Sequence, residues 1–355
     1  MIFLKRALVY SLVFLTSNLY ASICVNSTSN YKMFGSVLRA NVLQNPFIMA
    51  FEDEKFSDYQ IFNAENNAQL ASQIQEMTTN HCDVILGLYT SRDCLVSGPI
   101  LEKNHTVAIS SSCSDNHISD FFPYIYTAVP KLSDYSSDVA NYLNEDSDTG
   151  TIYAFFQPFD VYSNSGFSAF QKAIKKTIIQ IPVSTTGEFD ISKIDINDKK
   201  STIIFFTYPL PSTQILVTLD ADKRITKNIS LIGASSWMFD LSVFRPIKSI
   251  LEKANAVLSP DIVDRNAVNS SKFYSNFIKL YYRQPDLIEV LSYDMARLSV
   301  QCYKKYINDK ENMKTDFLKC LQNEKYHGVS GKTSFALGSP FAERKTYLVN
   351  LLDWV

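Results

Sequence analysis

Short apolar runs rich in β-branched and aromatic residues recur along the 355-residue chain, and longer segments with helical spacing separate them. Runs of this length and composition suit strands that are buried on both faces of a parallel sheet. The runs that predict strands are residues 47–51, 84–89, 106–109, 151–156, 202–206, 230–232 and 255–258. Strands that alternate with amphipathic helices form parallel βαβ units, so we expect an α/β protein with doubly wound parallel sheets.

The segments between these runs carry apolar residues at the spacing of one helix face. Asn63 is expected to cap the first of these helices. The inner faces of this helix and of two later ones are expected to carry Leu70, Ile74 and Met77; Tyr135, Val139 and Leu143; and Phe167, Phe170 and Ile174. Pro285 is expected to open a further helix, because proline is tolerated in a first turn. After Gly328 the pattern changes to that of β-hairpin strands.

The start of the chain predicts a signal peptide over residues 1–21. Lys5 and Arg6 form its positive start, residues 7–15 form its apolar stretch, and residues 19–21 form a cleavage site. A membrane anchor is the alternative, but a spanning helix needs about 20 apolar residues. Here polar residues interrupt the run after nine. We therefore expect a periplasmic or secreted protein.

The charge and length of the chain limit its partners and its organisation. The sequence carries 34 Lys and Arg against 36 Asp and Glu, and loss of Lys5 and Arg6 with the leader moves the formal charge from −2 to −4. A chain of this charge shows no sign of binding nucleic acid. About 334 residues remain after cleavage, more than a single core usually holds, so two domains are expected.

Six cysteines form an even set in a chain bound for an oxidising compartment, so disulfides are expected. Six cysteines allow about 15 pairing schemes, and strand order decides among them. Two of the cysteines begin strands that should be neighbours, two lie at ligand-facing strand ends, and two lie on or beside consecutive helices. The predicted pairs are Cys24–Cys82, Cys94–Cys113 and Cys302–Cys320.

Metal and catalytic chemistry find little support in the sequence. Cys113 and His117 form a close Cys/His pair, but no further residues complete a ligand set, so neither a metal nor another cofactor is expected. A secreted hydrolase is the enzyme alternative, but no Gly-x-Ser-x-Gly elbow is present and four histidines leave few bases. We expect that the protein is not an enzyme.

A series of residues in the last third of the chain points to a known family. In order, they are Phe273-Tyr274, Tyr281-Tyr282, Pro285, Ser292-Tyr293-Asp294-Met295-Ala296, Tyr326-His327-Gly328-Val329-Ser330-Gly331, Phe335 and Gly338. With this series, the chain from about residue 80 to its end resembles the type I periplasmic binding proteins, in particular the branched-chain amino-acid-binding (leucine/isoleucine/valine) branch. Residues 22–79 match poorly, so the N-terminal ligand contacts of the family are not carried over.

The resemblance implies a monomer of two doubly wound parallel-sheet lobes joined by a three-strand hinge, which closes on a ligand like a flytrap. Lobe 1 would comprise residues 22–128 and 259–328. Lobe 2 would comprise residues 129–258 and 329–355. Ligands in open α/β sheets bind outside the carboxyl ends of the strands, so the loops after the strands should line the cleft.

Hydroxyl groups and backbone amides gather after two neighbouring predicted strands, where they would form an anion-binding surface without fixed charge. The resemblance places the ligand carboxylate at Ser91, at the backbone of Ser112 and at Ser114. The alternative is that these serines only cap helices and turns.

In lobe 2, Tyr162 and Tyr208 follow two predicted strands and match family positions that contact ligand, although a core role would also suit tyrosine. Ser235 stands where amino-acid binders of the family carry an acidic residue for the ligand ammonium. Trp237 is expected to form either an apolar wall or part of the core. Arg92 and Asp160 are candidate charged contacts, with solvated surface as the alternative. Ser235 carries no charge, so it cannot neutralise a ligand ammonium.

We therefore expect a solute-binding protein that captures a small carboxylate or amide, rather than a plain branched-chain amino acid, and delivers it to an ABC-type membrane permease. A ligand sensor or scaffold subunit for a membrane signalling partner is the alternative function, because the same lobes would serve it.

Overall fold

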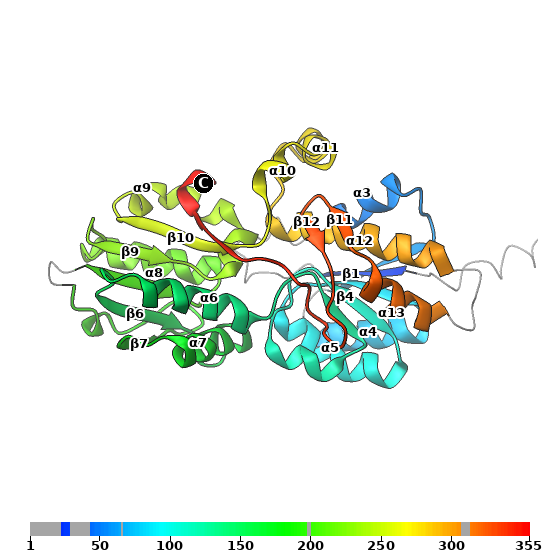
Figure 1. Ribbon diagram of the computed structural model, residues 1–355, viewed down its shortest axis with the longest axis horizontal. Coiled ribbons are helices and arrows are strands. Elements are labelled where there is room, and N and C mark those ends of the chain that lie inside the picture. Colours follow the sequence, from blue (N-terminus) through cyan, green and yellow to red (C-terminus); the bar gives the residue numbers. More distant parts are fainter. Residues whose placement is uncertain (1–22, 29–42, 65–66, 197–199, 307–312) are drawn as a thin grey trace, which may run out of the picture.

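The computed structural model describes residues 23–28, 43–64, 67–196, 200–306 and 313–355, so the predicted signal peptide lies outside the described residues. Two lobes lie side by side, each built on its own sheet, and the chain passes between them (Figure 1). We call the sheet that begins with β1 the first sheet and the sheet that begins with β6 the second sheet. This is the two-lobed α/β architecture expected from the sequence.

The first sheet has the order β2-β1-β3-β4-β5 within the described residues, and every neighbouring pair is parallel. Its strands are β1 (Ile23–Thr28), β2 (Tyr59–Ala64), β3 (Val84–Leu88), β4 (Val107–Ser110) and β5 (Ile125–Thr127). The helices of this lobe are α3 (Asn45–Asp53), α4 (Asn67–Thr79), α5 (Ser91–Asn104), α12 (Leu287–Tyr306) and α13 (Met313–Asn323). A 3₁₀ helix, η2 (Asn116–Phe121), precedes β5.

The second sheet repeats the same parallel order, β7-β6-β8-β9-β10, and adds the antiparallel strand β13 beside β10. Its strands are β6 (Thr151–Phe156), β7 (Ile178–Pro182), β8 (Ser201–Phe205), β9 (Ile229–Ile232), β10 (Ala256–Asp261) and β13 (Tyr347–Asn350). Its helices are α6 (Leu132–Glu145), α7 (Val161–Ala173), α8 (Pro209–Ala221) and α9 (Lys248–Leu251). The 3₁₀ turns of this lobe are η3 (Ile191–Lys193), η4 (Ser235–Phe239), η5 (Leu241–Val243), η6 (Arg245–Ile247) and η7 (Leu351–Asp353).

Two helices and a hairpin connect these lobes. After β10 the chain forms α10 (Arg265–Asn269) and α11 (Lys272–Tyr281), which project from the molecule between the lobes (Figure 1). The antiparallel hairpin of β11 (Tyr326–Gly328) and β12 (Gly331–Thr333) follows α13.

Both sheets are covered by helices on their two faces, which explains why their strands read as continuous apolar runs. In the first sheet, Val84 and Leu86 belong to the core that also contains α3 and α12, whereas Ile85 packs with α4 and α5. In the second sheet, Ile152 packs with α6 and α7, whereas Tyr153 lies in the opposite core with α8. Side chains of a strand alternate between faces, so one run supplies both cores.

Three local predictions differ from the structure. Residues 47–51, expected as a strand, lie in helix α3, which has Pro46 in its first turn and packs on α12. A run of five apolar residues does not distinguish a strand from a buried helix, and here the contact with α12 decides. Asn63 lies in β2 and does not cap α4, and α12 begins at Leu287, after Pro285.

The chain passes from the first sheet to the second after β5, through residues 128–131, and returns after β10. Its last passage falls later than the sequence indicated. The amide of Thr127 donates to the carbonyl of Pro340 (2.8 Å), and Phe341 is buried in the core of the first lobe. Residues 329–342 therefore still contact the first lobe, and the chain enters the second sheet only at β13.

Candidate functional site

The doubly wound order of each sheet locates the edge at which a ligand is expected. In an order of this kind the ligand lies at the carboxyl ends of the two strands where the winding reverses. These strands are β1 and β3 in the first sheet, and β6 and β8 in the second. Ser91 follows β3, Tyr162 follows β6, and Tyr208 follows β8. These three predicted residues thus follow the switch-point strands, whereas Ser114 follows β4 and Ser235 follows β9.

The two strand edges face each other across the lobes. Helix α5 of the first lobe contacts α7 of the second. Burial raises the pKa of Asp160 above its usual value, Arg92 on α5 opposes that rise, and the charge of Asp115 adds to it. Burial also raises the pKa of Tyr208 well above its usual value, and Asp160, Tyr162, Asp93 and Asp115 add to it in that order. Residues from both lobes are therefore within electrostatic reach of one another.

The serine cluster differs from the expected anion site because its amides are already bonded. The Ser91 hydroxyl oxygen accepts the amides of Ser114 (3.2 Å) and Asp115 (3.1 Å). The Ser110 hydroxyl oxygen accepts the amides of Ser112 (3.1 Å) and Cys113 (2.9 Å). Buried N–H groups rarely remain unpaired, and neighbouring hydroxyls satisfy these. The expectation that the Ser112 amide is free for a carboxylate is therefore wrong in this conformation.

Two acceptor groups remain at this edge. The Ser114 hydroxyl has no hydrogen-bond partner among the described residues. Asp115 is completely buried, and its Oδ1 accepts the amide of His117 (2.9 Å) and lies 2.9 Å from the His117 ring nitrogen Nδ1. Its Oδ2 has no hydrogen-bond partner. The sequence analysis missed Asp115, although it directly follows Ser114 in the same loop after a strand.

A glycine allows the first edge to pack tightly. Gly87, near the end of β3, has a φ of +89°, and a Cβ atom there would lie 2.1 Å from the carbonyl oxygen of Asn26. The side-chain amide of Asn26 in turn donates to the carbonyl of Gly87 (2.8 Å). Only glycine tolerates this conformation together with this contact. The switch point of the first sheet is therefore held by a direct contact between β1 and β3.

The predicted tyrosines form one stacked pair in the second lobe. The rings of Tyr162 and Tyr208 lie 5.0 Å apart with an interplanar angle of 24°. The Tyr162 hydroxyl lies 3.0 Å from the hydroxyl of Ser235 and accepts the amide of Ser236 (3.1 Å). Ser235 stands where amino-acid binders of the family carry an acidic residue, and here it positions the hydroxyl of Tyr162. Both rings are almost fully buried.

Trp237 belongs to the core and does not line the cleft. Its side chain is completely buried, and its indole Nε1 donates to the hydroxyl of Ser212 (2.9 Å). Its ring centroid lies 5.1 Å from that of Phe205 and 4.6 Å from that of Phe244. The Trp237 ring packs against neighbouring apolar residues. Of the two roles expected from the sequence, an apolar wall or part of the core, the core role is therefore correct.

Asp160 and Arg92 occupy the rims of the two edges. Asp160 caps α7, since its Oδ1 accepts the amide of Ser163 (2.8 Å). Arg92 is exposed on the first turn of α5, where it is the cation that opposes the pKa rise of Asp160. The capping box of α5, formed by Thr90 and Asp93, holds this turn in place. The charge of Arg92 in the first lobe thus acts on Asp160 in the second.

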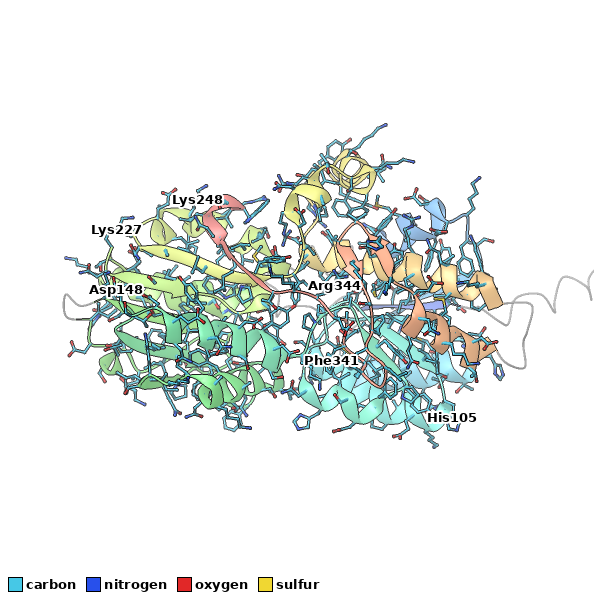
Figure 2. All side chains as sticks on the ribbon, viewed as in Figure 1. His105, Asp148, Lys227, Lys248, Phe341 and Arg344 are labelled. Atoms are coloured by element: carbon cyan, nitrogen blue, oxygen red, sulfur yellow. A yellow bond between two sulfur atoms is a disulfide. The ribbon has the colours of Figure 1, made fainter. Side chains whose placement is uncertain are left out.

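A polar network ties the passages between the lobes together. Asp294 of α12 accepts the amides of Val329 (2.9 Å) and Ser330 (2.7 Å). Arg344 donates to the carbonyl oxygens of Ala128 (2.7 Å) and Ser330 (3.1 Å). Figure 2 shows Arg344 between the lobes, with Phe341 on the side of the first. The network gives a role to Asp294 of the sequence series, and a Cβ atom at Gly328 would lie 2.3 Å from the Asp294 carboxylate.

The three disulfides pair as predicted: Cys24–Cys82, Cys94–Cys113 and Cys302–Cys320. The second joins α5 to the loop after β4, directly behind the serine cluster. No group of three His, Cys, Asp or Glu side chains in the described residues could hold a metal ion. Within the same residues, no helix is both long enough and apolar enough to cross a membrane.

Comparisons with known proteins bear on the family and the fold. A family model described as the receptor family ligand binding region matches residues 56–355. No protein with a curated description matches the chain significantly.

Solved structures of solute-binding proteins share the fold. The branched-chain amino acid transporter substrate-binding protein LivJ of Streptococcus pneumoniae, solved with isoleucine, has a TM-score of 0.74 and 15% identity over 93% of this chain and 96% of its own. A solute-binding protein of an ABC transporter from Rhodopseudomonas palustris, solved with 3,4-dihydroxybenzoic acid, has a TM-score of 0.75 and 14% identity over 93% of both chains. The leucine-binding protein LivK of Thermotoga maritima has a TM-score of 0.73 and 11% identity over 94% of this chain and 99% of its own. These likenesses confirm the fold expected from the sequence.

Proposed function

Because the chain belongs to the receptor family ligand-binding region and has the fold of type I periplasmic binding proteins, we propose that it is an extracytoplasmic solute-binding protein. It captures a small polar ligand between its lobes and has no catalytic role. One observation carries the proposal. Helix α5 of the first lobe contacts α7 of the second, and the charges of Asp93 and Asp115 in the first lobe act on Tyr208 of the second.

The ligand of this cleft carries hydrogen-bond donors. The amides of the serine cluster are occupied, whereas the Ser114 hydroxyl and the Asp115 Oδ2 lack partners. A buried carboxylate oxygen without a partner is costly, and a donor from a ligand would offset that cost. Of the two ligand types expected from the sequence, the amide fits this edge better than the carboxylate. A small amide or amine is therefore the ligand class we propose.

Capture proceeds by hinge closure. We divide the chain into the two lobes expected from the sequence, with the third boundary moved from residue 328 to the stretch between Ala342 and Tyr347, where the contact with the first lobe ends. Tyr162 and Tyr208 are almost fully buried. A ligand enters when the lobes open and is enclosed when they rotate back, as in other two-lobed binding proteins.

Delivery to an ABC-type permease follows from this role, because the solved relatives are described as substrate-binding proteins of such transporters. The predicted leader places the protein in the periplasm or outside the cell, where its three disulfides are stable. We propose a monomer, because a single copy contains both edges of the cleft. A membrane sensor that reads the closed form is the alternative partner.

A thermal-shift screen of the mature protein tests the proposal. Small amides, amines, carboxylates and branched-chain amino acids are compared at one concentration, since a ligand of the folded state raises the unfolding temperature. We expect an amide or amine to give the largest rise, and small-angle scattering to show a smaller radius of gyration with that ligand. A radius that stays the same at saturation would contradict capture by closure.

A further inference from the structure

A second cavity lies apart from the serine and tyrosine residues of the cleft. It has a volume of about 290 Å³ and is bounded by η5 and η6, by α10 and α11, and by the residues that precede α12. Ser91, Ser114, Tyr162 and Tyr208 are not among its lining residues. Because η5 lies between β9 and β10 of the second sheet and α12 packs on the first lobe, the cavity lies where the two lobes meet.

Arg265 on the wall of this cavity is a buried cation with unused donors. Its side chain is only 7% exposed, and its Nε donates to Oδ2 of the completely buried Asp261 (2.7 Å). The terminal nitrogen Nη2 is buried without a hydrogen-bond partner, and no hydrogen bond joins Nη1 to a described residue. Buried guanidinium donors normally find acceptors. No described residue therefore supplies an acceptor for the terminal nitrogens of Arg265.

The charge of the cavity is uneven. Arg283 is compensated, since its Nη1 donates to Oε2 of Glu289 (2.8 Å) and lies 3.8 Å from Asp286. Arg245, in contrast, is exposed and forms no ion pair with a described residue. The Asp261 carboxylate meets Arg265 through Nε alone. Arg245 is therefore the cation of the lining whose charge no carboxylate of the described residues pairs.

The remaining walls are largely apolar and aromatic. Tyr274, Tyr281 and Trp354 line the cavity together with Leu241 and Val268. The Arg265 guanidinium lies 5.8 Å from the centre of the Trp354 ring, so one of its faces is covered by an aromatic surface. A pocket with a cationic wall and an apolar remainder fits a ligand with an anionic head and an apolar body.

We propose that this cavity binds a small carboxylate with an apolar body, and that Arg265 and Arg245 hold its carboxylate group. The planar fork of a guanidinium matches the two oxygens of a carboxylate, which makes such pairs shorter and stronger than neutral hydrogen bonds. This site is additional to the cleft of the proposed function and does not depend on it. A carboxylate ligand fits this site better than it fits the serine cluster, because the amides of that cluster already donate to hydroxyl groups.

Calorimetry with the mature protein tests this site with benzoate, its neutral counterpart benzamide, and inorganic phosphate. We expect benzoate to bind and the other two not to bind at the same concentration. Arg245→Gln should weaken benzoate about tenfold or more, which corresponds to the loss of one charge-assisted hydrogen bond. Arg265→Lys should have a similar effect, because lysine keeps a charge for Asp261 but lacks the fork.

Matched variants separate this site from general charge effects and from the cleft. Arg224→Lys is the control for Arg265→Lys, because Arg224 also pairs with an aspartate, Asp222, through Nε at 2.7 Å. Lys172→Gln on α7 is the control for Arg245→Gln. Both controls should keep the benzoate affinity, as should Ser114→Ala.

Three outcomes would overturn the proposal. The first is benzoate affinity that is unchanged in both Arg245→Gln and Arg265→Lys. The second is equal binding of benzamide or phosphate. The third is loss of benzoate binding in Ser114→Ala alone, which would place the carboxylate in the cleft. Arg245 is exposed, so its variant remains informative even if Arg265→Lys fails to fold.

Discussion

The hydroxyl of Tyr162 lies 3.0 Å from the hydroxyl of Ser235, so the serine that replaces an expected acidic residue holds a cleft tyrosine in place. The same tyrosine oxygen accepts the amide of the completely buried Ser236. The ring of Tyr162 in turn stacks on Tyr208, so a hydroxyl pair within one lobe sets the orientation of both rings.

Removal of the Tyr162 hydroxyl should therefore cost stability. In Tyr162→Phe the Ser236 amide is left buried without an acceptor, and we expect the free energy of unfolding to fall by about 1–3 kcal/mol. Ser235→Ala removes one hydroxyl bond but leaves the amide paired, so its cost should be smaller. Urea unfolding measures both, and Tyr142→Phe on the exposed face of α6 is the control. Equal stability of Tyr162→Phe and Tyr142→Phe would contradict this role.

Asp115 should decide whether the cleft accepts donor-rich ligands. Asp115→Asn keeps the size of the side chain but removes the negative charge and replaces one acceptor oxygen with a donor. We expect the affinity for the amide or amine found by the screen to fall at least about tenfold, as for loss of a charge-assisted hydrogen bond. Calorimetry measures the change, with Asp120→Asn on the exposed side of η2 as control. Unchanged affinity in Asp115→Asn would remove Asp115 from the site.

Asp160 should make stability depend on pH in a specific direction. Burial raises its folded pKa above the ordinary value of 3.8, so folding favours the protonated form. Its contribution is most favourable below pH 3.8 and declines as the pH rises through the folded pKa. Asparagine caps helices as well as aspartate does, so Asp160→Asn removes this titration and keeps the cap of α7.

The stability advantage of the native protein over Asp160→Asn should therefore shrink as the pH rises from about 3 to 7. Urea unfolding of both proteins at several pH values within this range gives the difference directly. Contributions from other carboxyl groups cancel in the comparison. A difference that grows with pH would show that Arg92 and the Ser163 amide outweigh burial at this carboxylate.

The disulfide Cys94–Cys113 should matter for binding as well as for stability. Its replacement by two serines releases the loop after β4 from α5, and we expect a loss of about 3 kcal/mol in unfolding free energy. The matched control is the same change at Cys302–Cys320, because the sequence separations are 19 and 18 residues. Both variants should lose similar stability, but only the first should weaken ligand binding in the cleft. Equal affinities would show that the loop keeps its shape without the bond.

The sequence by itself determined the alternation of strands and helices and the resemblance to two-lobed binding proteins. The run at residues 151–156 matches β6, and all three disulfides agree with their predicted pairs. These features are readable because burial of an apolar strand on both faces is a property of the local sequence. Two of the disulfides follow from the expected positions of their cysteines on the strands, and the third joins consecutive helices.

Only the tertiary structure decided which partner each polar group meets. Residues 47–51 became helix α3 because α12 covers them, and Trp237 turned into the core beside Phe205. The amide of Ser112 donates to a hydroxyl, and the spacing of residues in the sequence does not predict that bond. Asp115 and Arg265 each keep a buried atom without a hydrogen-bond partner. Hydrogen bonds between distant residues depend on how whole lobes pack, and a residue's type and neighbours in the chain do not carry that information.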